Sequence, residues 1–293
     1  MRFSKMHGAG NDFVVLAPDN PDADWEALAR ALCDRHFGVG ADGLLLALPS
    51  SRCDIRMRMF NPDGSEAEMC GNGIRCLAKY AVESGLAQAR GDAVTVETLA
   101  GDLRCKLSGA GGRVERVRVA MGVPRFAPAE IPVLAEGEGP VRNLVLVAGG
   151  CELSLTCVSM GNPHAVFFAE DPIDRIELER LGPLVERHPA FPRRVNFEVV
   201  NDVERGRVRA RVWERGAGLT LACGTGACAV GVAAHLAGYS DRRTSVELPG
   251  GTLEIEWDGA GEVFLTGPAV EVFRGEWLRP VERSAAAMLA GSA

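Results

Sequence analysis

The tetrapeptide Cys70-Gly71-Asn72-Gly73 recurs later in the chain as Cys223-Gly224-Thr225-Gly226, an offset of 153 residues from Cys70 to Cys223. Other segments recur in the same order at offsets of 150 to 152 residues: 10–15 with 161–166, 35–36 with 187–188, and 96–101 with 246–251. Ordered recurrence at a nearly constant period indicates an internal duplication. Prolines and glycines are concentrated between residues 124 and 145. We therefore expect an N-terminal half, 1–124, and a C-terminal half, 125–293, with part of the C-terminal strand able to cross over.

The two halves also share an order of predicted elements. In each half a β-rich run leads through a glycine-containing turn to the Cys-Gly-x-Gly motif, and an apolar helix follows. These runs and helices are 54–60 and 74–84 in the first half, and 207–213 and 227–237 in the second. Further β runs at 93–107 and 244–257 and further helices at 24–36 and 174–187 complete the pattern, and the tail at 284–293 is expected to fray or to cap a helix. The sequence predicts an α+β fold of two similar domains, each a strongly curved β-sheet around a central apolar helix.

The composition argues against several classes of function. The 293-residue chain carries a formal net charge of −7, whereas nucleic-acid binding usually rests on a basic surface. No apolar run approaches the roughly 18 residues that span a membrane, and the N-terminus lacks the apolar core of a signal peptide. We expect a cytoplasmic protein, with neither nucleic acid nor a membrane as partner. Its nine cysteines, an odd number, are then expected to be reduced thiols.

Neither a metal nor an organic cofactor is expected. The sequence contains no Cys-x-x-Cys pair and no His-x-x-x-His pair, which argues against a structural zinc site. The three lysines, Lys5, Lys79 and Lys106, lie outside glycine-rich anion-binding loops, which argues against pyridoxal phosphate held as a Schiff base.

The duplicated motif predicts acid–base chemistry on a small anion. Each cysteine precedes the start of a helix, where unpaired N–H groups and a partial positive charge favour a carboxylate or a thiolate. Two such helix starts that face each other would place Cys70 and Cys223 on opposite faces of one α-carbon. Inverting a stereocentre needs a base on one face and an acid on the other, and backbone dipoles would stabilise the enediolate. We therefore expect a cofactor-independent amino-acid racemase or epimerase.

Two other functions stay open on the residues alone. Gly224-Thr225-Gly226 opens a helix after a strand, as a dinucleotide-binding fingerprint does, but the next glycine, Gly231, is two positions too late. A non-catalytic binding protein could use the same cleft, and it would not need a matched pair of thiols. Cys76 and Cys228, inside the predicted helices, are expected to be core residues.

Several longer stretches carry a resemblance to a known family: 5–13, 60–65, 69–76, 161–164, 214–218, 222–228 and 265–268. Together they resemble the diaminopimelate epimerases, which are pyridoxal-phosphate-independent amino-acid racemases. The resemblance implies two pseudo-symmetric domains, each a barrel-like sheet around a central helix, with the active site in the cleft between them. It implies interconversion of LL- and meso-2,6-diaminopimelate, a step towards lysine and peptidoglycan.

The resemblance also implies roles for individual residues. The catalytic residues that it implies are Cys70 and Cys223, with His164 and Glu214 supporting the proton transfers. The residues that it implies for substrate binding are Asn11, Asn61, Gly71, Asn72, Asn162, Asn196, Glu214, Arg215, Gly224 and Thr225. Arg215 suits a carboxylate through bidentate hydrogen bonds, and Glu214 suits an ammonium group.

Two positions depart from the family pattern. Gly43 stands where some members have glutamine, and Leu219 replaces the acidic residue that is usual in the run Glu214–Thr220. A related racemase that acts on another amino acid, such as histidine, therefore stays open as an alternative. The family forms homodimers, partly through an aromatic residue near Phe273, so the resemblance also implies a homodimer.

Overall fold

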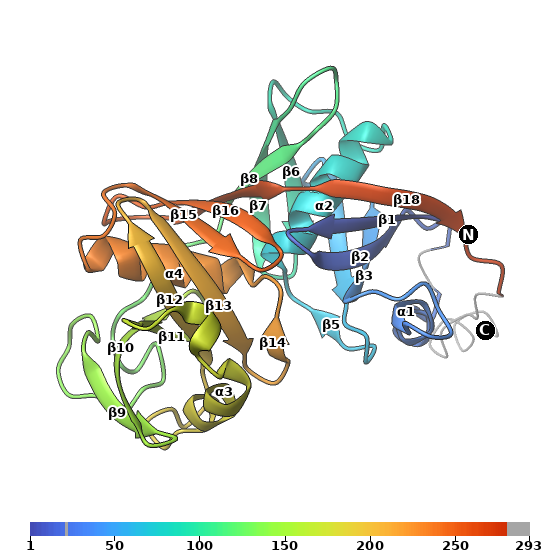
Figure 1. The fold of residues 1–293 in the computed structure, drawn as a ribbon. Coiled ribbons are helices and arrows are strands. Elements are labelled where there is room, and N and C mark those ends of the chain that lie inside the picture. The colour runs from blue at the N-terminus through green and yellow to red at the C-terminus, as the bar shows by residue number, and fades with distance from the viewer. Residues whose placement is uncertain (21–22, 280–293) are drawn as a thin grey trace. The chain divides into compact units, whose positions relative to one another are not determined.

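The computed structural model describes residues 1–20 and 23–279, and it divides into two compact units (Figure 1). Unit 1 contains Met1–Val119 and the described residues from Gly267 onward, and unit 2 contains Ala120–Thr266. The sequence places the boundary between the halves after residue 124, whereas the chain of the structure leaves unit 1 after Val119. The tail at 284–293 lies outside the described residues.

Unit 1 is a mixed sheet with two helices. Its strands are β1 (Arg2–Gly8), β2 (Asn11–Leu16), β3 (Gly43–Leu48), β4 (Ile55–Phe60), β5 (Glu66–Ala67), β6 (Ala93–Thr98), β7 (Gly101–Ser108), β8 (Arg116–Ala120) and β18 (Val270–Glu276), and its helices are α1 (Trp25–Cys33) and α2 (Gly71–Glu83). Strands β2 and β3 pair in parallel, as do β4 and β6, while β1–β2, β3–β4 and β6–β7 are antiparallel. Helix α1 lies on the crossover between the first parallel pair, and α2 on the crossover between the second.

Unit 2 repeats this arrangement. Its strands are β9 (Leu144–Ala148), β10 (Cys151–Ser159), β11 (Pro163–Phe168), β12 (Asn196–Glu204), β13 (Arg207–Glu214), β14 (Gly218–Thr220), β15 (Arg243–Leu248), β16 (Gly251–Glu256) and β17 (Phe264–Pro268), and its helices are η1 (Ile173–Arg175), α3 (Leu178–Glu186) and α4 (Gly224–Leu236). The parallel pairs are β11–β12 and β13–β15. The predicted α+β class is thus confirmed.

Each unit has one central helix. Helix α2 contacts β1, β2, β3, β4, β6 and β7, and α4 contacts the matching strands β10, β11, β12, β13, β15 and β16 (Figure 1). The sequence of α4 suits this burial because it carries no Asp, Glu, Lys or Arg. A Cβ at Gly231 would lie 2.6 Å from Ile255 Cγ2, so a glycine lets the helix approach β16 closely. Cys76 and Cys228 are 0% exposed in these helices, which confirms them as core residues.

The strand registers of the two units match the sequence repeat. Phe13 lies opposite Gly43 in the pair β2–β3, and His164 lies opposite Asn196 in the pair β11–β12. Because a slip by one residue would turn every side chain to the other face of the sheet, this match makes the two halves equivalent position by position. Two residues further along, Leu45 in β3 is therefore equivalent to Glu198 in β12.

The last described strand of the chain returns to unit 1. Strand β9 follows β8 along the chain and pairs with β10, and both β9 and β10 lie in unit 2. Strand β18 follows β17, yet it pairs with β1 of unit 1. The C-terminal half of the chain therefore contributes one strand to the sheet of unit 1.

The four long helices occur where the sequence predicts them, but their ends differ. Helices α2 and α4 begin three residues earlier than predicted, because the carbonyls of Cys70 and Cys223 each accept a helical hydrogen bond at 2.9 Å. Helix α1 ends at Cys33 because the Asp34 carboxylate accepts the N–H groups of the next turn. Helix α3 begins only at Leu178, after the short helix η1 and an extended residue at 176.

Candidate active site

Cys70 is the N-cap residue of α2 in unit 1, and Gly71 is the first helical residue. The cysteine backbone is extended, with φ −139° and ψ 125°. Its thiol is partly exposed and donates to Asn11 Oδ1 at an Sγ–O distance of 3.7 Å. Cys70 therefore stands at the N-terminal end of α2, where the first N–H groups of a helix find no acceptor within the helix itself.

Asn72 connects this cluster to a buried cation. Its side chain is 1% exposed, its Nδ2 donates to Asn11 Oδ1 at 3.1 Å, and its Oδ1 accepts from Arg75 Nη2 at 2.9 Å. On the other side, Asn11 Nδ2 donates to Asp42 Oδ2 at 2.8 Å. Because a carboxylate only accepts hydrogen bonds, Asp42 fixes the Asn11 amide with its oxygen towards Cys70.

Cys223 is the N-cap residue of α4 in unit 2, with φ −117° and ψ 120°. It is 6% exposed, its Sγ accepts the Gly226 N–H at 3.4 Å, and it lies 3.5 Å from Thr225 Oγ1. Burial raises the pKa of the Cys223 thiol well above its ordinary value, the negative charge of Glu214 raises it further, and the Thr225 hydrogen bond opposes the rise. At neutral pH this cysteine is therefore a thiol that can give a proton.

A buried acid–base pair supports the Cys223 side. Asn162 Nδ2 donates to Thr225 Oγ1 at 3.2 Å, and Asn162 Oδ1 lies 2.9 Å from His164 Nε2. The other ring nitrogen, Nδ1, lies 2.7 Å from Glu198 Oε1, and both side chains of this pair are 0% exposed. Burial raises the pKa of Glu198 above its ordinary value, while the charge and hydrogen bond of His164 oppose this.

The sequence does not single out Glu198. Two signals could have found it. Asn196 and Glu198 stand at positions i and i+2 of one strand, so their side chains share a face. In addition, an acidic residue replaces the buried Leu45 of the other half at an equivalent register position.

A third group of predicted site residues, besides those around Cys70 and Cys223, lies where β13 ends. Asn196 is 4% exposed, its Oδ1 accepts the Arg215 N–H at 2.8 Å, and its Nδ2 donates to the Pro163 carbonyl at 2.9 Å. Glu214 Oε1 accepts from Thr220 Oγ1 at 2.7 Å. The amide of Asn196 therefore holds the turn that carries Glu214 and the exposed Arg215.

The hydrogen bonds divide the predicted site residues into sets. One set in unit 1 joins Asn11, Cys70 and Asn72, and one in unit 2 joins Asn162, His164, Cys223 and Thr225. Asn61 lies in the turn after β4, where its Nδ2 donates to Ser65 Oγ at 2.9 Å. In the described part of the chain, Asn61 takes no part in the hydrogen bonds within either set.

Comparisons with known proteins match nearly the whole chain. A model of the family described as diaminopimelate epimerase matches residues 3–127 and 156–272. The diaminopimelate epimerase of Desulforudis audaxviator is 54% identical over 286 residues, which cover 95% of this chain and 100% of that protein. The diaminopimelate epimerase of Moorella thermoacetica is 52% identical over 280 residues, which cover 94% and 99%. The chain belongs to the diaminopimelate epimerase family.

A solved structure outside the diaminopimelate epimerase family shares the fold. A probable proline racemase from Agrobacterium radiobacter is similar with a TM-score of 0.69 and 19% sequence identity, covering 95% of this chain and 93% of that one. At this identity the likeness concerns the architecture alone.

The two departures from the diaminopimelate epimerase pattern differ in their surroundings. A Cβ at Gly43 would lie 3.1 Å from the Phe60 carbonyl oxygen and 3.3 Å from a ring carbon of Phe13, so a longer side chain there would require these neighbours to shift. Leu219 lies on β14 opposite Trp213 and is 42% exposed. The structure gives no further account of the leucine.

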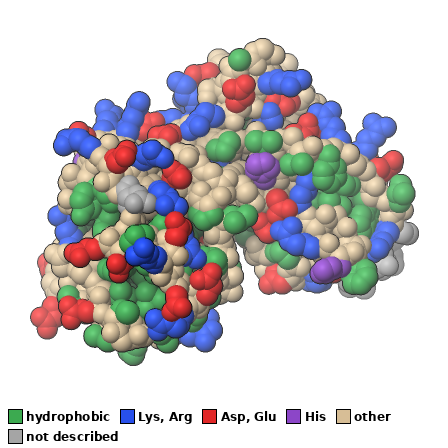
Figure 2. Space-filling model, in the orientation of Figure 1, with side chains coloured by type: hydrophobic (Ala, Val, Ile, Leu, Met, Phe, Trp, Pro, Cys, Tyr) green, Lys and Arg blue, Asp and Glu red, His purple; other side chains and the backbone are tan. Residues whose placement is uncertain are grey.

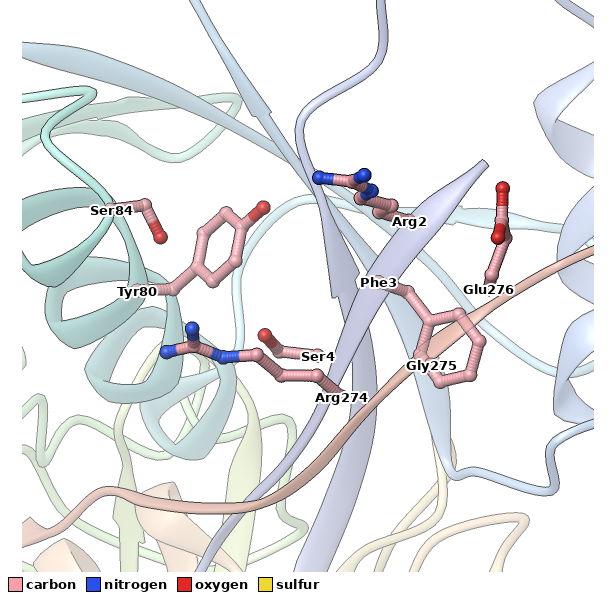
Figure 3. A pocket seen from close by; sticks show the side chains of 8 residues that line it. All are labelled: Arg2, Phe3, Ser4, Tyr80, Ser84, Arg274, Gly275 and Glu276. Atoms are coloured by element: carbon pink, nitrogen blue, oxygen red, sulfur yellow. The ribbon is translucent and has the colours of Figure 1, made fainter.

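One open pocket of about 540 Å³ lies away from these residues, between α2, β1 and β18 (Figure 3). It is lined by Arg2, Phe3, Ser4, Tyr80, Ser84, Arg274, Gly275 and Glu276, and it contains none of the residues that the diaminopimelate epimerase resemblance implies. On the face shown in Figure 2, basic and acidic side chains are interspersed.

Within the described residues, no group of three or more His, Cys, Asp or Glu residues is arranged to hold a metal ion. None of the described helices has the length and apolar character that crossing a membrane requires.

Proposed function

We propose that this protein interconverts LL- and meso-2,6-diaminopimelate, with Cys70 and Cys223 as paired acid and base on one α-carbon. The observation that carries the proposal is the near-complete match to the diaminopimelate epimerase family, combined with a cysteine at the N-cap of the central helix in each unit. The reaction contributes to the formation of lysine and peptidoglycan precursors.

The two thiols exchange one proton each with the substrate. One sulfur begins as a thiolate and removes the α-proton, so that its S–H bond forms as the substrate C–H bond breaks. The electron pair passes into the substrate carboxylate, and N–H groups at the starts of α2 and α4 stabilise the enediolate. The other sulfur then delivers its proton to the opposite face and becomes a thiolate. His164 and Glu214 support these transfers.

Substrate selection rests on the end of diaminopimelate that does not react. Arg215 binds its carboxylate, while Glu214 and the side-chain oxygens of Asn11 and Asn61 accept from its ammonium group. An amino acid without this second zwitterionic end leaves such groups unpaired, and sites built for hydrogen bonding discriminate strongly on that basis. Asn196 contributes by holding the turn of Arg215.

The protein acts in the cytoplasm as a homodimer. The support for the dimer is the exposed apolar surface of β18, where Val272 is 57% and Phe273 47% exposed. Light scattering after size exclusion tests it: Phe273→Glu is expected to shift the mass from that of two chains to that of one, and a wild-type mass of one chain would contradict it.

A solvent-exchange assay tests the reaction. Purified enzyme with reductant and LL-diaminopimelate in D2O is expected to give meso product carrying deuterium at the α-carbon. Cys70→Ala and Cys223→Ala should each lower the rate by a factor on the order of 10²–10⁴ or more, the usual share of a general acid or base. Cys76→Ala and Cys228→Ala are matched controls from the same two helices, where the thiols are fully buried in the core.

The outcomes separate the alternatives. Full activity of Cys70→Ala or Cys223→Ala would contradict the two-thiol mechanism. Exchange with another amino acid, such as histidine, but not with diaminopimelate would assign the protein a different substrate and would leave the two-thiol mechanism in place. No exchange with any amino acid, together with ligand binding unchanged in both cysteine variants, would favour a binding protein.

A further inference from the structure

The equivalent amides Asn11 and Asn162 are oriented in opposite ways. Asn11 presents Oδ1 to Cys70, because its Nδ2 donates to Asp42 behind it. Asn162 presents Nδ2 to Thr225, because its Oδ1 contacts His164 Nε2 behind it. The group behind each amide therefore decides whether that side of the site offers an acceptor or a donor.

The Asn162 orientation fixes where His164 carries a proton. An amide oxygen only accepts, so Nε2 must bear the hydrogen in its 2.9 Å contact with Asn162 Oδ1. The Nδ1–Oε1 contact of 2.7 Å then needs a second proton, either on the ring nitrogen or on the Glu198 carboxyl. In both forms the pair is neutral overall. If the pair lost one proton, the ring could instead carry its hydrogen on Nδ1, and the Asn162 amide would be free to turn over.

The surroundings of Glu198 keep the second proton on the pair. The carboxyl is 0% exposed, and within the described residues no group hydrogen-bonds to its Oε2. Besides His164, the described titratable groups that act most strongly on it include Cys157 on β10, Glu214 on β13 and Cys223 on α4, and none of these three is a cation. Negative charge without a second hydrogen-bonding partner is costly in such a place.

The other half shows that this pair is not required by the fold. Phe13 and Leu45 occupy the equivalent positions in unit 1, and both are 0% exposed. A Cβ at Gly73 would meet Leu45 Cδ2 at 3.2 Å, whereas a Cβ at the equivalent Gly226 would meet Glu198 Oε1 at 3.0 Å. One unit thus places apolar groups behind its helix start, and the other places an acid.

We propose that Glu198 is a positioning residue which, through His164, holds the Asn162 amide with its NH₂ group towards Thr225, and so makes the Cys223 side of the site a hydrogen-bond donor. The inference rests on the proposed function and deepens it. Asn162 donates to Thr225, and the Thr225 hydroxyl is then free to donate to Cys223 Sγ, beside the Gly226 N–H. These donors stabilise the thiolate that Cys223 becomes after it has given its proton to the substrate.

A double-mutant cycle tests whether Glu198 acts through His164. Glu198→Gln keeps the shape but allows either ring tautomer, so kcat is expected to fall about five- to tenfold, the factor of one hydrogen bond, with KM little changed. His164→Phe introduces the residue type that the equivalent Phe13 has in the other half, and in that background Glu198→Gln should cause no further loss. Glu83→Gln, a carboxyl outside the site that accepts from Lys79, is the matched control and should leave kcat unchanged.

Nitrogen NMR of ¹⁵N-labelled histidine shows which ring nitrogen of His164 carries a proton. A merely structural role of Glu198 would leave this protonation pattern unchanged in Glu198→Gln. The His164 signals, assigned by their loss in His164→Phe, are expected to show a protonated Nε2 in the active wild-type enzyme and a mixture of tautomers in Glu198→Gln. An unprotonated Nε2 in the wild type, or equal losses of kcat from Glu198→Gln in both backgrounds, would overturn the inference. Absence of epimerisation by the wild type would instead refute the proposed function, so the two failures are distinguishable.

Discussion

Replacing Gly226 by alanine should destabilise unit 2, although alanine is the better helix former. The new Cβ would lie 3.0 Å from Glu198 Oε1, 3.2 Å from Cys223 Cβ and 3.4 Å from Cys223 Sγ. Glu198 is held by His164, and Cys223 is held as the helix cap, so neither neighbour can move without losing a contact. Overpacking of this kind costs about 1–3 kcal/mol, and the helix propensity of alanine returns at most about 1 kcal/mol. We expect a net loss of roughly 1–2 kcal/mol.

The equivalent change in the other unit, Gly73→Ala, is the matched control. There the Cβ would meet Leu45 Cδ2 at 3.2 Å and Cys70 Cβ at 3.5 Å, and a leucine methyl can rotate away. Thermal unfolding should lower the Tm of Gly226→Ala by roughly 2–4 °C, the shift that about 1–2 kcal/mol gives in a chain of this size. Gly73→Ala should change it by less than half as much. A Gly226→Ala variant as stable as the wild type, or equal losses in both variants, would refute the reasoning.

Two further predictions concern buried groups. Burial raises the pKa of Cys105 to about 12 from 9.0, so its stabilising contribution is fully present below pH 9.0 and is lost as the pH rises towards 12. Between these values the free energy of unfolding, measured with urea, should fall by about 1.4 kcal/mol per pH unit because of this thiol. If Cys105→Val leaves the slope of the unfolding free energy against pH unchanged, the prediction is contradicted. Arg75→Met should lower the free energy of unfolding by several kcal/mol, because the fully buried guanidinium donates to the carbonyls of Gly71 and Pro268 and to Asn72 Oδ1, and each buried acceptor left unpaired costs about 1–3 kcal/mol. A wild-type unfolding midpoint for Arg75→Met would show that these acceptors find other partners.

The features of the fold that the sequence predicts are those with a local cause. Glycines beside a cysteine at the end of a β run mark the start of a helix, and the structure has Cys70 and Cys223 as N-caps. The duplication predicts which positions of the two units correspond, since it relates the register of β3 to that of β12 without any knowledge of the contacts.

The features that the sequence leaves open depend on neighbouring strands. Asn11 and Asn162 are the same residue type at equivalent positions, yet their amides point in opposite ways, because Asp42 lies behind one and His164 behind the other. A residue type alone does not reveal which end of an amide faces the site. The sequence does not predict a buried Glu198 for a related reason. An acidic residue in a strand is usually expected at the surface, and only the register places this one in the core.

The return of β18 to unit 1 sets the order in which the units can be finished during synthesis. Unit 2 has its final strand, β17, as soon as residue 268 has left the ribosome, because β16, which pairs with β17, was made earlier. Unit 1 is made first, but the edge of β1 stays without β18 until residues 270–276 emerge. At 5–20 residues per second, the interval between the synthesis of β1 and that of β18 lasts roughly 15–50 s. The first unit to be translated is therefore the last to close, and during that time its β1 edge is the part of the nascent chain most open to pairing with another molecule.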